Sequence, residues 1–465
     1  MSDCVTNSSD NNITLITDYS YDAFGNKTTV TVDDGAGGID ARTTTTTYDA
    51  RGQFATSTTN ALGHSETRTY DAKYGVMLTL EGPNQLTTSW TYDSFGRQIK
   101  ETRADGTETT ITSEWCDGFL GETGNTNCPT GGALALTTQT TGAPTTVAYS
   151  DALGREIRVE TEGFAATGST VKAVYVDTVY DAQGRIDKKS RPYFEDVLAA
   201  NIKWHSFTYD VLSRPLTETS PDASVETTTY NGLETVVTNS KNQVNKRINN
   251  ARGELIQVID ADTNVTDYNY DAFGNLVKVE DALYNETINT YDIRGRKLTM
   301  DDPDMGYWTY NYNALGELTS QTDAKSQTVS MTYDKLGRML TRVENEGTTT
   351  WTYDTTSTYA AGQAAYSIGK LISVSSAEGN TDTNTCDSCG RLASTDTTID
   401  SLTYTTEQSY DLQGRLDTIT YPDSHHHSTG FQITNEYNAE GYLETVTDGT
   451  TDYWTANSQN AEGQL

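Results

Sequence analysis

Apolar and polar side chains alternate along short stretches of the chain. In Trp90-Thr91-Tyr92 and Trp351-Thr352-Tyr353 a threonine separates two aromatic residues, and the pattern is longer from Trp308 to Tyr312. Because successive side chains of a strand point to opposite faces, this spacing puts the aromatic rings on one face and Thr and Asn on the other. No stretch of the sequence shows a sustained apolar period of 3.6 residues. The pattern therefore predicts short β-strands and little helix.

These stretches end at a polar turn that recurs at a fixed interval. The sequence reads YDAFGN from Tyr270, YDIRGR from Tyr291, YNALGE from Tyr312 and YDKLGR from Tyr333, a spacing of 21 residues each time. A second cluster of turn residues keeps the same interval and opens at Asp260, Asp281, Asp302 and Asp323. Two turns in 21 residues leave room for two ordinary strands, so the predicted repeat unit is a β-hairpin.

The first turn has a readable geometry. Its Asp can accept a hydrogen bond from the chain two residues on, and the Gly three residues after the Asp can take the positive φ that ends a type I turn. This combination predicts a hairpin loop with a glycine bulge. We assign a structural role in the repeat to Tyr270, Asp271, Gly274, Tyr291, Asp292, Gly295, Arg296, Tyr312, Gly316, Tyr333, Asp334, Gly337 and Arg338.

An arginine follows the glycine in seven copies of the turn. We expect stacked hairpins to bring each Arg near the Asp of a neighbouring unit, giving a ladder of carboxylate–guanidinium pairs. The alternative is a row of arginines that binds a ligand, and we prefer the structural interpretation. The seven residues are Arg97, Arg155, Arg185, Arg296, Arg338, Arg391 and Arg415.

The repeat extends over nearly the whole chain, from Tyr21 to the final NAEGQL. We expect residues 1–465 to form one continuous array. Longer gaps between copies predict insertions at 113–147, 160–178, 192–206 and 354–384. The first residues lack the pattern of a signal peptide and the last stop inside a repeat, so we expect a segment of a longer protein.

Composition and charge narrow the possibilities. Only 34% of the residues are hydrophobic, while the chain has 29 tyrosines. This mix suits a thin sheet with aromatic packing better than a thick aliphatic core. The formal net charge of −33 argues against nucleic acid or an anionic membrane surface as a partner. No stretch approaches 18 apolar residues, so we expect no transmembrane helix in this segment.

Four of the five cysteines form two close groups. Cys116 and Cys128 bracket a loop rich in Gly and Asn, for which we expect a disulfide. Cys386 and Cys389 form a CDSC, which is compatible with half of a zinc site, a redox motif, a disulfide or two packed thiols. Zinc would need a second suitably spaced pair and a redox motif would need a βαβ setting. We therefore expect a disulfide or packed thiols.

The repeated Tyr-Asp-x-x-Gly-Arg, with copies such as YDSFGR, YDAQGR, YDKLGR and YDLQGR, resembles the Rhs or YD-repeat family. That family includes bacterial Rhs polymorphic toxins, shell subunits of insecticidal toxin complexes, wall-associated proteins and teneurins. The resemblance implies a coiled sheet of hairpins that forms a hollow shell or barrel, enclosing a C-terminal effector in the toxins. The Asp-Pro-x-Gly-Leu of an autoproteolytic Rhs segment is not matched by Asp302-Pro303-Asp304-Met305-Gly306. We therefore carry over no protease residue.

Other candidates for chemistry are weak. His425, His426 and His427, near Asp423, cannot all face one metal from a regular strand. The segment from Gly362 to Lys370 has the wrong spacing for a phosphate-binding loop. The acidic turn 301–304 lacks the ligand spacing of an EF-hand. We expect no catalytic residue, no cofactor and no metal site.

The sequence thus favours a non-enzymatic scaffold of an exported bacterial protein, outside the cell or at its surface. Its expected partner is the rest of its own polypeptide or an enclosed effector domain. The alternative is an adhesin or a self-associating surface filament whose aromatic faces bind glycans or proteins. A third possibility, an enzyme with its site in an insertion, would need a catalytic constellation that we do not find.

Overall fold

The computed structural model describes residues 3–6, 14–117, 124–354, 366–422 and 430–465. This part of the chain contains 39 β-strands and one short 3-10 helix, η2 (Ala199–Asn201). The prediction of an all-β fold with little helix is therefore confirmed. None of the helical structure in the described ranges is long and apolar enough to cross a membrane.

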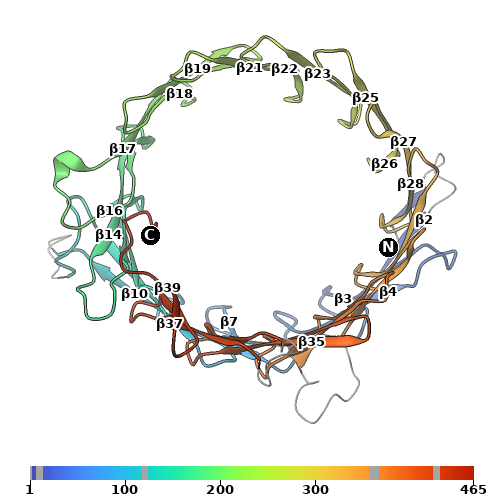
Figure 1. The fold of residues 1–465 in the computed structure, drawn as a ribbon, viewed down its shortest axis with the longest axis horizontal. Helices are drawn as coiled ribbons and strands as arrows, with labels where there is room; N and C mark the ends of the chain where they lie inside the picture. The colour runs from blue at the N-terminus through green and yellow to red at the C-terminus, as the bar shows by residue number, and fades with distance from the viewer. Residues whose placement is uncertain (1–2, 7–13, 118–123, 355–365, 423–429) are drawn as a thin grey trace. The chain divides into compact units, whose positions relative to one another are not determined.

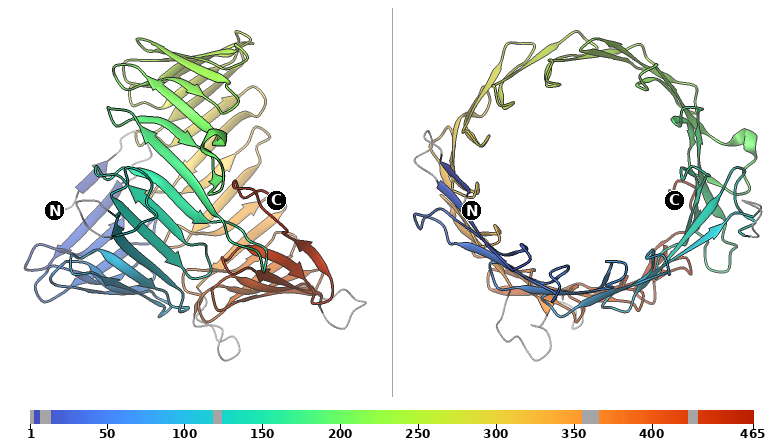
Figure 2. Two further views of the ribbon diagram at one scale, coloured as in Figure 1. Left: turned by 90° about the vertical axis from the view of Figure 1, so that its left-hand side faces the viewer. Right: turned by 180° about the vertical axis from the view of Figure 1, so that it is seen from behind.

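The strands fall into two compact units, which we describe separately. Unit 1 comprises Met1–Ser89 and Ile248–Thr406, and unit 2 comprises Trp90–Arg247 and Glu407–Leu465. Each unit therefore combines two stretches that lie far apart in the sequence. Figures 1 and 2 show the strands of each stretch side by side, joined by turns at both ends.

The strands of unit 1 are β1 (Asp3–Thr6), β2 (Thr14–Tyr21), β3 (Lys27–Asp33), β4 (Arg42–Tyr48), β5 (Ala55–Thr59), β6 (Ser65–Tyr70), β7 (Met77–Glu81), β22 (Leu255–Ile259), β23 (Val265–Tyr270), β24 (Leu276–Glu280), β25 (Glu286–Tyr291), β26 (Lys297–Asp302), β27 (Gly306–Tyr312), β28 (Leu318–Thr322), β29 (Thr328–Tyr333), β30 (Met339–Glu344), β31 (Gly347–Tyr353), β32 (Leu371–Ser375), β33 (Thr381–Cys386) and β34 (Leu392–Ile399).

The strands of unit 2 are β9 (Gln98–Thr102), β10 (Glu108–Trp115), β11 (Leu134–Thr140), β12 (Thr146–Ser150), β13 (Glu156–Glu162), β14 (Ala173–Tyr180), β15 (Ile186–Ser190), β16 (Tyr193–Phe194), β17 (Trp204–Tyr209), β18 (Pro215–Thr219), β19 (Val225–Asn231), β20 (Glu234–Thr238), β36 (Leu416–Thr420), β37 (Gln432–Tyr437), β38 (Leu443–Thr447) and β39 (Asp452–Thr455). The strands that include a boundary between units are β8 (Thr87–Tyr92), β21 (Val244–Asn249) and β35 (Leu402–Tyr410).

Strands that are consecutive in the chain pair antiparallel, as expected for a series of hairpins. β23 pairs with β24, β24 with β25 and β25 with β26. The register shifts between Thr290 and Tyr291, the last residues before the glycine turn. The same shift recurs between Thr332 and Tyr333. One extra residue per turn is what a glycine bulge produces.

The two faces of the hairpins carry the predicted side chains. Met331, on the same side of β29 as Tyr333, is buried at 8% exposure. Thr332 points the other way, is exposed, and shares a hydrogen bond with Thr341 across the strand pair. Equivalent hydroxyl pairs are Thr69–Thr79, Thr208–Thr217 and Thr290–Thr299. The interior is thin, because five of the eleven buried hydrophobic residues among those described are alanines.

Candidate functional site: the repeat turns and the Arg42 pocket

The turn after Tyr291 shows how the repeat is built. One carboxylate oxygen of Asp292 accepts hydrogen bonds from the backbone N–H groups of Arg294 (2.8 Å) and Arg296 (2.9 Å). The N–H of Gly295 donates to the Asp292 carbonyl at 2.9 Å, and Gly295 has a φ of +76°. Burial would raise the pKa of Asp292, but the hydrogen bonds from Arg296 lower it overall. This is the type I turn with a glycine bulge that the sequence predicted.

The arginine after the glycine binds the aspartate of its own turn. Arg185 Nε lies 2.7 Å from Asp181 Oδ2, four residues earlier. The predicted Asp–Arg ladder between neighbouring units is therefore wrong for most copies, because the tight turn brings its own fifth residue back onto the aspartate. The ion pair of Arg338 with Asp354 does reach an aspartate of the following repeat. The pairs within one turn are Arg97–Asp93, Arg155–Asp151, Arg185–Asp181, Arg214–Asp210, Arg296–Asp292, Arg338–Asp334, Arg391–Asp387 and Arg415–Asp411.

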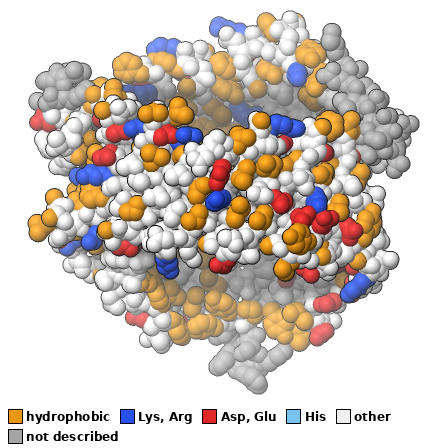
Figure 3. All heavy atoms as spheres, turned by 90° about the horizontal axis from the view of Figure 1, so that it is seen from above, with side chains coloured by type: hydrophobic (Ala, Val, Ile, Leu, Met, Phe, Trp, Pro, Cys, Tyr) orange, Lys and Arg blue, Asp and Glu red, His pale blue; other side chains and the backbone are white. Residues whose placement is uncertain are grey.

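A cation–π contact links neighbouring repeats, and Arg185 and Arg296 also donate hydrogen bonds to the carbonyls of Asp210 and Asn313 in the next turn. The guanidinium of Arg415 lies 4.1 Å from the ring centroid of Tyr437, the tyrosine that opens the next copy. Such a contact stabilises a partly exposed site by about 0.5–1 kcal/mol. The same contact joins Arg155 to Tyr180, Arg185 to Tyr209, Arg214 to Tyr230, Arg296 to Tyr312 and Arg338 to Tyr353. Figure 3 shows acidic and basic side chains next to one another in several places, in line with the ion pairs within the turns.

The tyrosine hydroxyl has a fixed partner that the sequence analysis missed. Tyr333 donates to the carbonyl of Leu318 at 2.9 Å, and Tyr270 donates to that of Leu255 at 3.0 Å. In both cases the acceptor is the second residue after the glycine of the preceding turn, 15 residues earlier. The signal in the sequence was the 17-residue distance between these tyrosines and the preceding glycines, Gly316 and Gly253. Burial also raises the pKa of Tyr333.

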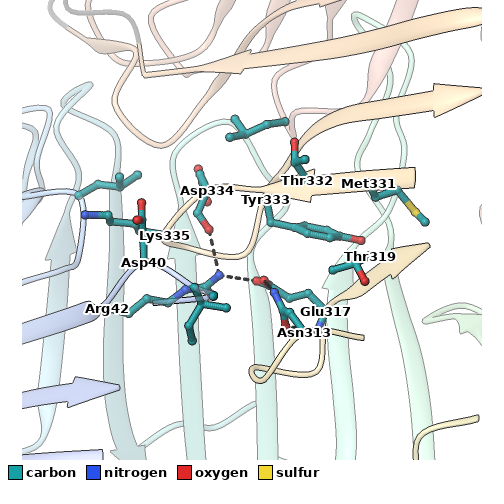
Figure 4. Close-up of a pocket in the computed structure, with 14 residues that line it drawn as sticks. Asp40, Arg42, Asn313, Glu317, Thr319, Met331, Thr332, Tyr333, Asp334 and Lys335 are labelled. Atoms are coloured by element: carbon teal, nitrogen blue, oxygen red, sulfur yellow. Dashed lines mark hydrogen bonds and ion pairs between the residues drawn. The ribbon is translucent and has the colours of Figure 1, made fainter. Parts of the chain in front are cut away.

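A cavity of about 530 Å³ lies in unit 1 where the start of β4 meets the turns before β28 and β30. Arg42 Nη2 contacts Glu317 Oε1 at 2.6 Å and donates to the Asp334 carbonyl at 3.1 Å. Figure 4 shows Arg42 between these two turns, with Met331 and Thr319 further along the wall. These contacts join residues 275 and 292 positions apart in the sequence.

The copy at Tyr312 departs from the common motif in a way that explains this contact. It reads YNALGE, with Asn313 in place of Asp and Glu317 in place of Arg. Asn313 still accepts from the backbone N–H of Glu317 (3.0 Å), and its side-chain amide donates to Glu317 Oε2 (2.6 Å). The turn therefore keeps its shape, and the other carboxylate oxygen of Glu317 binds Arg42.

A second copy with Asn in the Asp place makes a similar long-range contact in unit 2. In YNAEGY, the Asn438 amide donates to the buried carbonyl of Ala165 at 2.9 Å. The hydroxyl of Tyr442 donates to the Glu162 carbonyl at 2.8 Å. Both Asn-containing turns thus join distant stretches of one unit. The polar groups of these turns therefore bind other parts of the chain. The described residues include no group of three or more His, Cys, Asp and Glu that could hold a metal.

The two cysteine pairs differ. Cys116 and Cys128 form a disulfide that closes the loop after β10. Cys386 and Cys389 are free thiols, so the possible disulfide between them is wrong. Cys386 is buried and occupies the position of the repeat tyrosine at the end of β33. The turn that follows has the ordinary hydrogen bond from the Gly390 N–H to the Asp387 carbonyl, and this turn geometry does not bring the two thiols together.

The other sequence candidates are placed as follows. Residues 423–429, with the three histidines and Asp423, and residues 355–365 lie outside the described part of the chain. In the acidic turn, the Asp302 carboxylate accepts from the backbone N–H groups of Asp304 and Met305 and from the Thr287 hydroxyl. Asp302 is therefore an ordinary residue of the second turn of the repeat, the one that also opens at Asp260, Asp281 and Asp323.

Comparisons with known proteins agree with this geometry. The sequence pattern of the family described as RHS Repeat matches residues 250–286 and 312–349. Double-stranded DNA deaminase toxin A of Burkholderia cenocepacia (strain H111) is 34% identical over 131 residues, which are 27% of this chain and 8% of that protein.

Among solved structures, the fold resembles the crystal structures of TcdB2-TccC3 and TcdB2-TccC3-Cdc42. Each has a TM-score of 0.58 and 14% identity over 96% of this chain. The match covers 31% of the first structure's chain and 33% of the second's. This chain therefore spans about a third of the solved chains and less than a tenth of the curated relative.

Proposed function

We propose that this chain, in which residues 250–286 and 312–349 match the RHS Repeat family, is a non-enzymatic scaffold within a longer exported polypeptide, forming part of a shell around an effector domain of that polypeptide. The family match and the likeness in fold support the scaffold. The relative named as a deaminase toxin supports a place in a toxin-associated protein. The deaminase activity in that name belongs to the relative.

One observation carries the proposal: the signature residues of the repeat are occupied by contacts with one another. In the copy at Tyr291 the hydroxyl binds the Leu276 carbonyl, Asp292 binds its own turn and Arg296, and Arg296 also lies over the next tyrosine. A row of catalytic or ligand-binding groups would instead leave its donors and acceptors free. The repeat residues therefore hold the array together.

Two features support a location outside the cytoplasm, at the cell surface or beyond it. The Cys116–Cys128 disulfide is of a kind that persists in oxidising compartments. The net charge of −33 favours solubility. We also propose that residues 1–465 are one array interrupted by insertions at 113–147, 160–178, 192–206 and 354–384.

Limited proteolysis of the full-length polypeptide tests the scaffold. We expect sparse trypsin to leave the array as one protease-resistant body, identified by mass spectrometry, with a β-rich circular dichroism spectrum. Cleavage at most repeat turns at the same rate, or a helix-rich resistant core, would contradict the proposal.

A further inference from the structure

One cavity of unit 2 is lined by a loop and by the strands next to it. The cavity, of about 460 Å³, is lined by residues from three of the four predicted insertions. Segment 113–147 contributes Pro129, Thr130 and Gly131, segment 160–178 contributes Asp177 and Thr178, and segment 192–206 contributes Trp204. Asp177 and Thr178 lie on β14 and Trp204 begins β17, so the disulfide-closed loop after β10 is the part of this lining that a regular repeat lacks.

The rim of the cavity is fixed by the disulfide. Cys128 bonds to the buried Cys116 and directly precedes Pro129. The N–H of Gly132 donates to the Pro129 carbonyl at 2.9 Å, closing a tight turn over Thr130 and Gly131. A turn held at both ends presents its side chain and backbone groups in one arrangement, which a binding site requires.

The polar wall consists of two arginine–aspartate pairs. Arg158 makes two hydrogen bonds to Asp177, at 2.6 and 2.8 Å. Arg155 binds Asp151 at 2.6 Å. Each guanidinium has its carboxylate, so the formal charge of the wall is zero. The wall offers N–H donors and carboxylate acceptors side by side without favouring an anion or a cation.

The aromatic wall is Trp204, at the start of β17. Its side chain is half-buried, and the Lys188 ammonium lies 4.4 Å from the ring centroid. Within the described ranges the indole N–H has no hydrogen-bond partner, whereas the indole N–H of Trp308 donates to the Met305 carbonyl. Trp204 therefore supplies an aromatic surface to the cavity.

We propose that this cavity binds a neutral sugar, one or two residues of a glycan. Sugar hydroxyls both donate and accept, which matches the paired Arg and Asp groups. The apolar face of a sugar ring packs on an aromatic side chain such as Trp204. The volume lies within the range of about 300–1,000 Å³ that is usual for small-molecule sites. A phosphate or sugar acid would find both arginines already neutralised, with the Lys188 ammonium over the Trp204 ring as the remaining nearby cation.

The test is binding of the full chain to an array of neutral and acidic glycans, followed by calorimetry on the neutral glycans retained. We expect Trp204→Ala to weaken binding about tenfold, from the loss of the ring contact. The control Trp308→Ala, in unit 1, should bind as the unsubstituted chain does. A second variant, Thr130→Phe, fills the cavity from its rim and should abolish binding while the circular dichroism spectrum stays unchanged.

Three results would overturn the proposal. The first is no neutral glycan bound at millimolar concentration. The second is unchanged affinity in both Trp204→Ala and Thr130→Phe. The third is retention of acidic glycans alone. Binding that falls in Trp204→Ala and Thr130→Phe but not in Trp308→Ala supports it.

Discussion

The hydroxyl of Tyr333 donates a hydrogen bond of 2.9 Å to the carbonyl oxygen of Leu318, one strand earlier in the sheet. The same relationship holds between Tyr270 and Leu255 and between Tyr291 and Leu276. Each tyrosine therefore ties the end of its own hairpin to the start of the preceding strand. The hydroxyl accounts for tyrosine, where phenylalanine would pack equally well.

We predict that Tyr333→Phe lowers the free energy of unfolding by about 1 kcal/mol, because it removes this bond and leaves a partly buried carbonyl without its donor. Urea denaturation of the full chain measures the change. Tyr307→Phe is the matched control, since Tyr307 is 53% exposed and should tolerate the loss of its hydroxyl. Equal midpoints for the two variants would show that the hydroxyl bond contributes nothing.

Burial decides how much each Asp–Arg pair contributes to the free energy of unfolding. The side chains of Arg296 and Asp292 are 14% and 0% exposed, whereas those of Arg97 and Asp93 are 60% and 20% exposed. We predict that Arg296→Met destabilises the protein by about 2–3 kcal/mol, because it leaves a buried carboxylate without its partner. Arg97→Met should have little measurable effect, since solvent screens that pair. Similar losses in the two variants, measured by urea denaturation, would contradict this argument.

The second turn of the repeat, after Asp260, has a residue other than glycine in left-handed backbone. Thr263 has a φ of 69° in the turn after Asp260, at the place that glycine occupies in the YD turns. Left-handed backbone is unfavourable for a β-branched residue. Thr263→Gly should therefore raise the free energy of unfolding by about 0.5–1 kcal/mol.

The reverse substitution serves as the control. Gly253 has a φ of +83°, and a Cβ added there would meet no atom within 4 Å. Gly253→Thr should then be destabilising through backbone strain alone, by about 1–2 kcal/mol. The same sign of change in Thr263→Gly and Gly253→Thr would contradict this interpretation.

The stability of the array should depend on pH at both extremes. Backbone hydrogen bonds from Arg97 and Arg214 lower the pKa values of Asp93 and Asp210 below 3.8. A carboxyl with a lowered folded pKa stabilises above its unfolded pKa, and that stability is lost as pH falls through the folded value. We expect the urea midpoint to fall below about pH 4.

The tyrosines act at the alkaline end. Burial raises the pKa values of Tyr291 and Tyr333 above 10.0. Their contribution is complete below the unfolded pKa and is lost as pH rises through the folded pKa, so the midpoint should also fall above about pH 10. Urea midpoints from pH 2 to 12 should show a plateau between these limits. A midpoint that peaks sharply inside that range, or that rises below pH 4, would contradict the assignment.

The sequence predicted the hairpins, the bulged turn and the two faces because those depend on local spacing of two, three and 21 residues. It failed on Arg185, because the repeat places the guanidinium near Asp181 of its own turn and Asp210 of the next copy and does not choose between them. Whether the Tyr333 hydroxyl reaches Leu318 depends on the stagger between strands, which no local pattern encodes.

The long-range contacts between side chains could not be predicted from the sequence. Arg42 and Glu317 lie 275 residues apart, and the only trace in the sequence is that Asn313 and Glu317 replace the usual Asp and Arg. The cavity at Trp204 depends in the same way on the disulfide-closed loop, whose Pro129, Thr130 and Gly131 line it together with residues of β14 and β17. A residue that departs from the repeat motif thus marks a position whose side chain makes a contact outside its own turn.

The central claim is that the array is a scaffold that encloses another part of its own polypeptide. The most direct test is the rate at which a protease cleaves the remainder of the full-length protein, compared between the native sequence and Arg296→Met. The account predicts slow cleavage in the native protein and faster cleavage in the variant, since a destabilised array should open more often. Rapid cleavage of the remainder in the native protein, at the rate found when it is expressed alone, would contradict the claim.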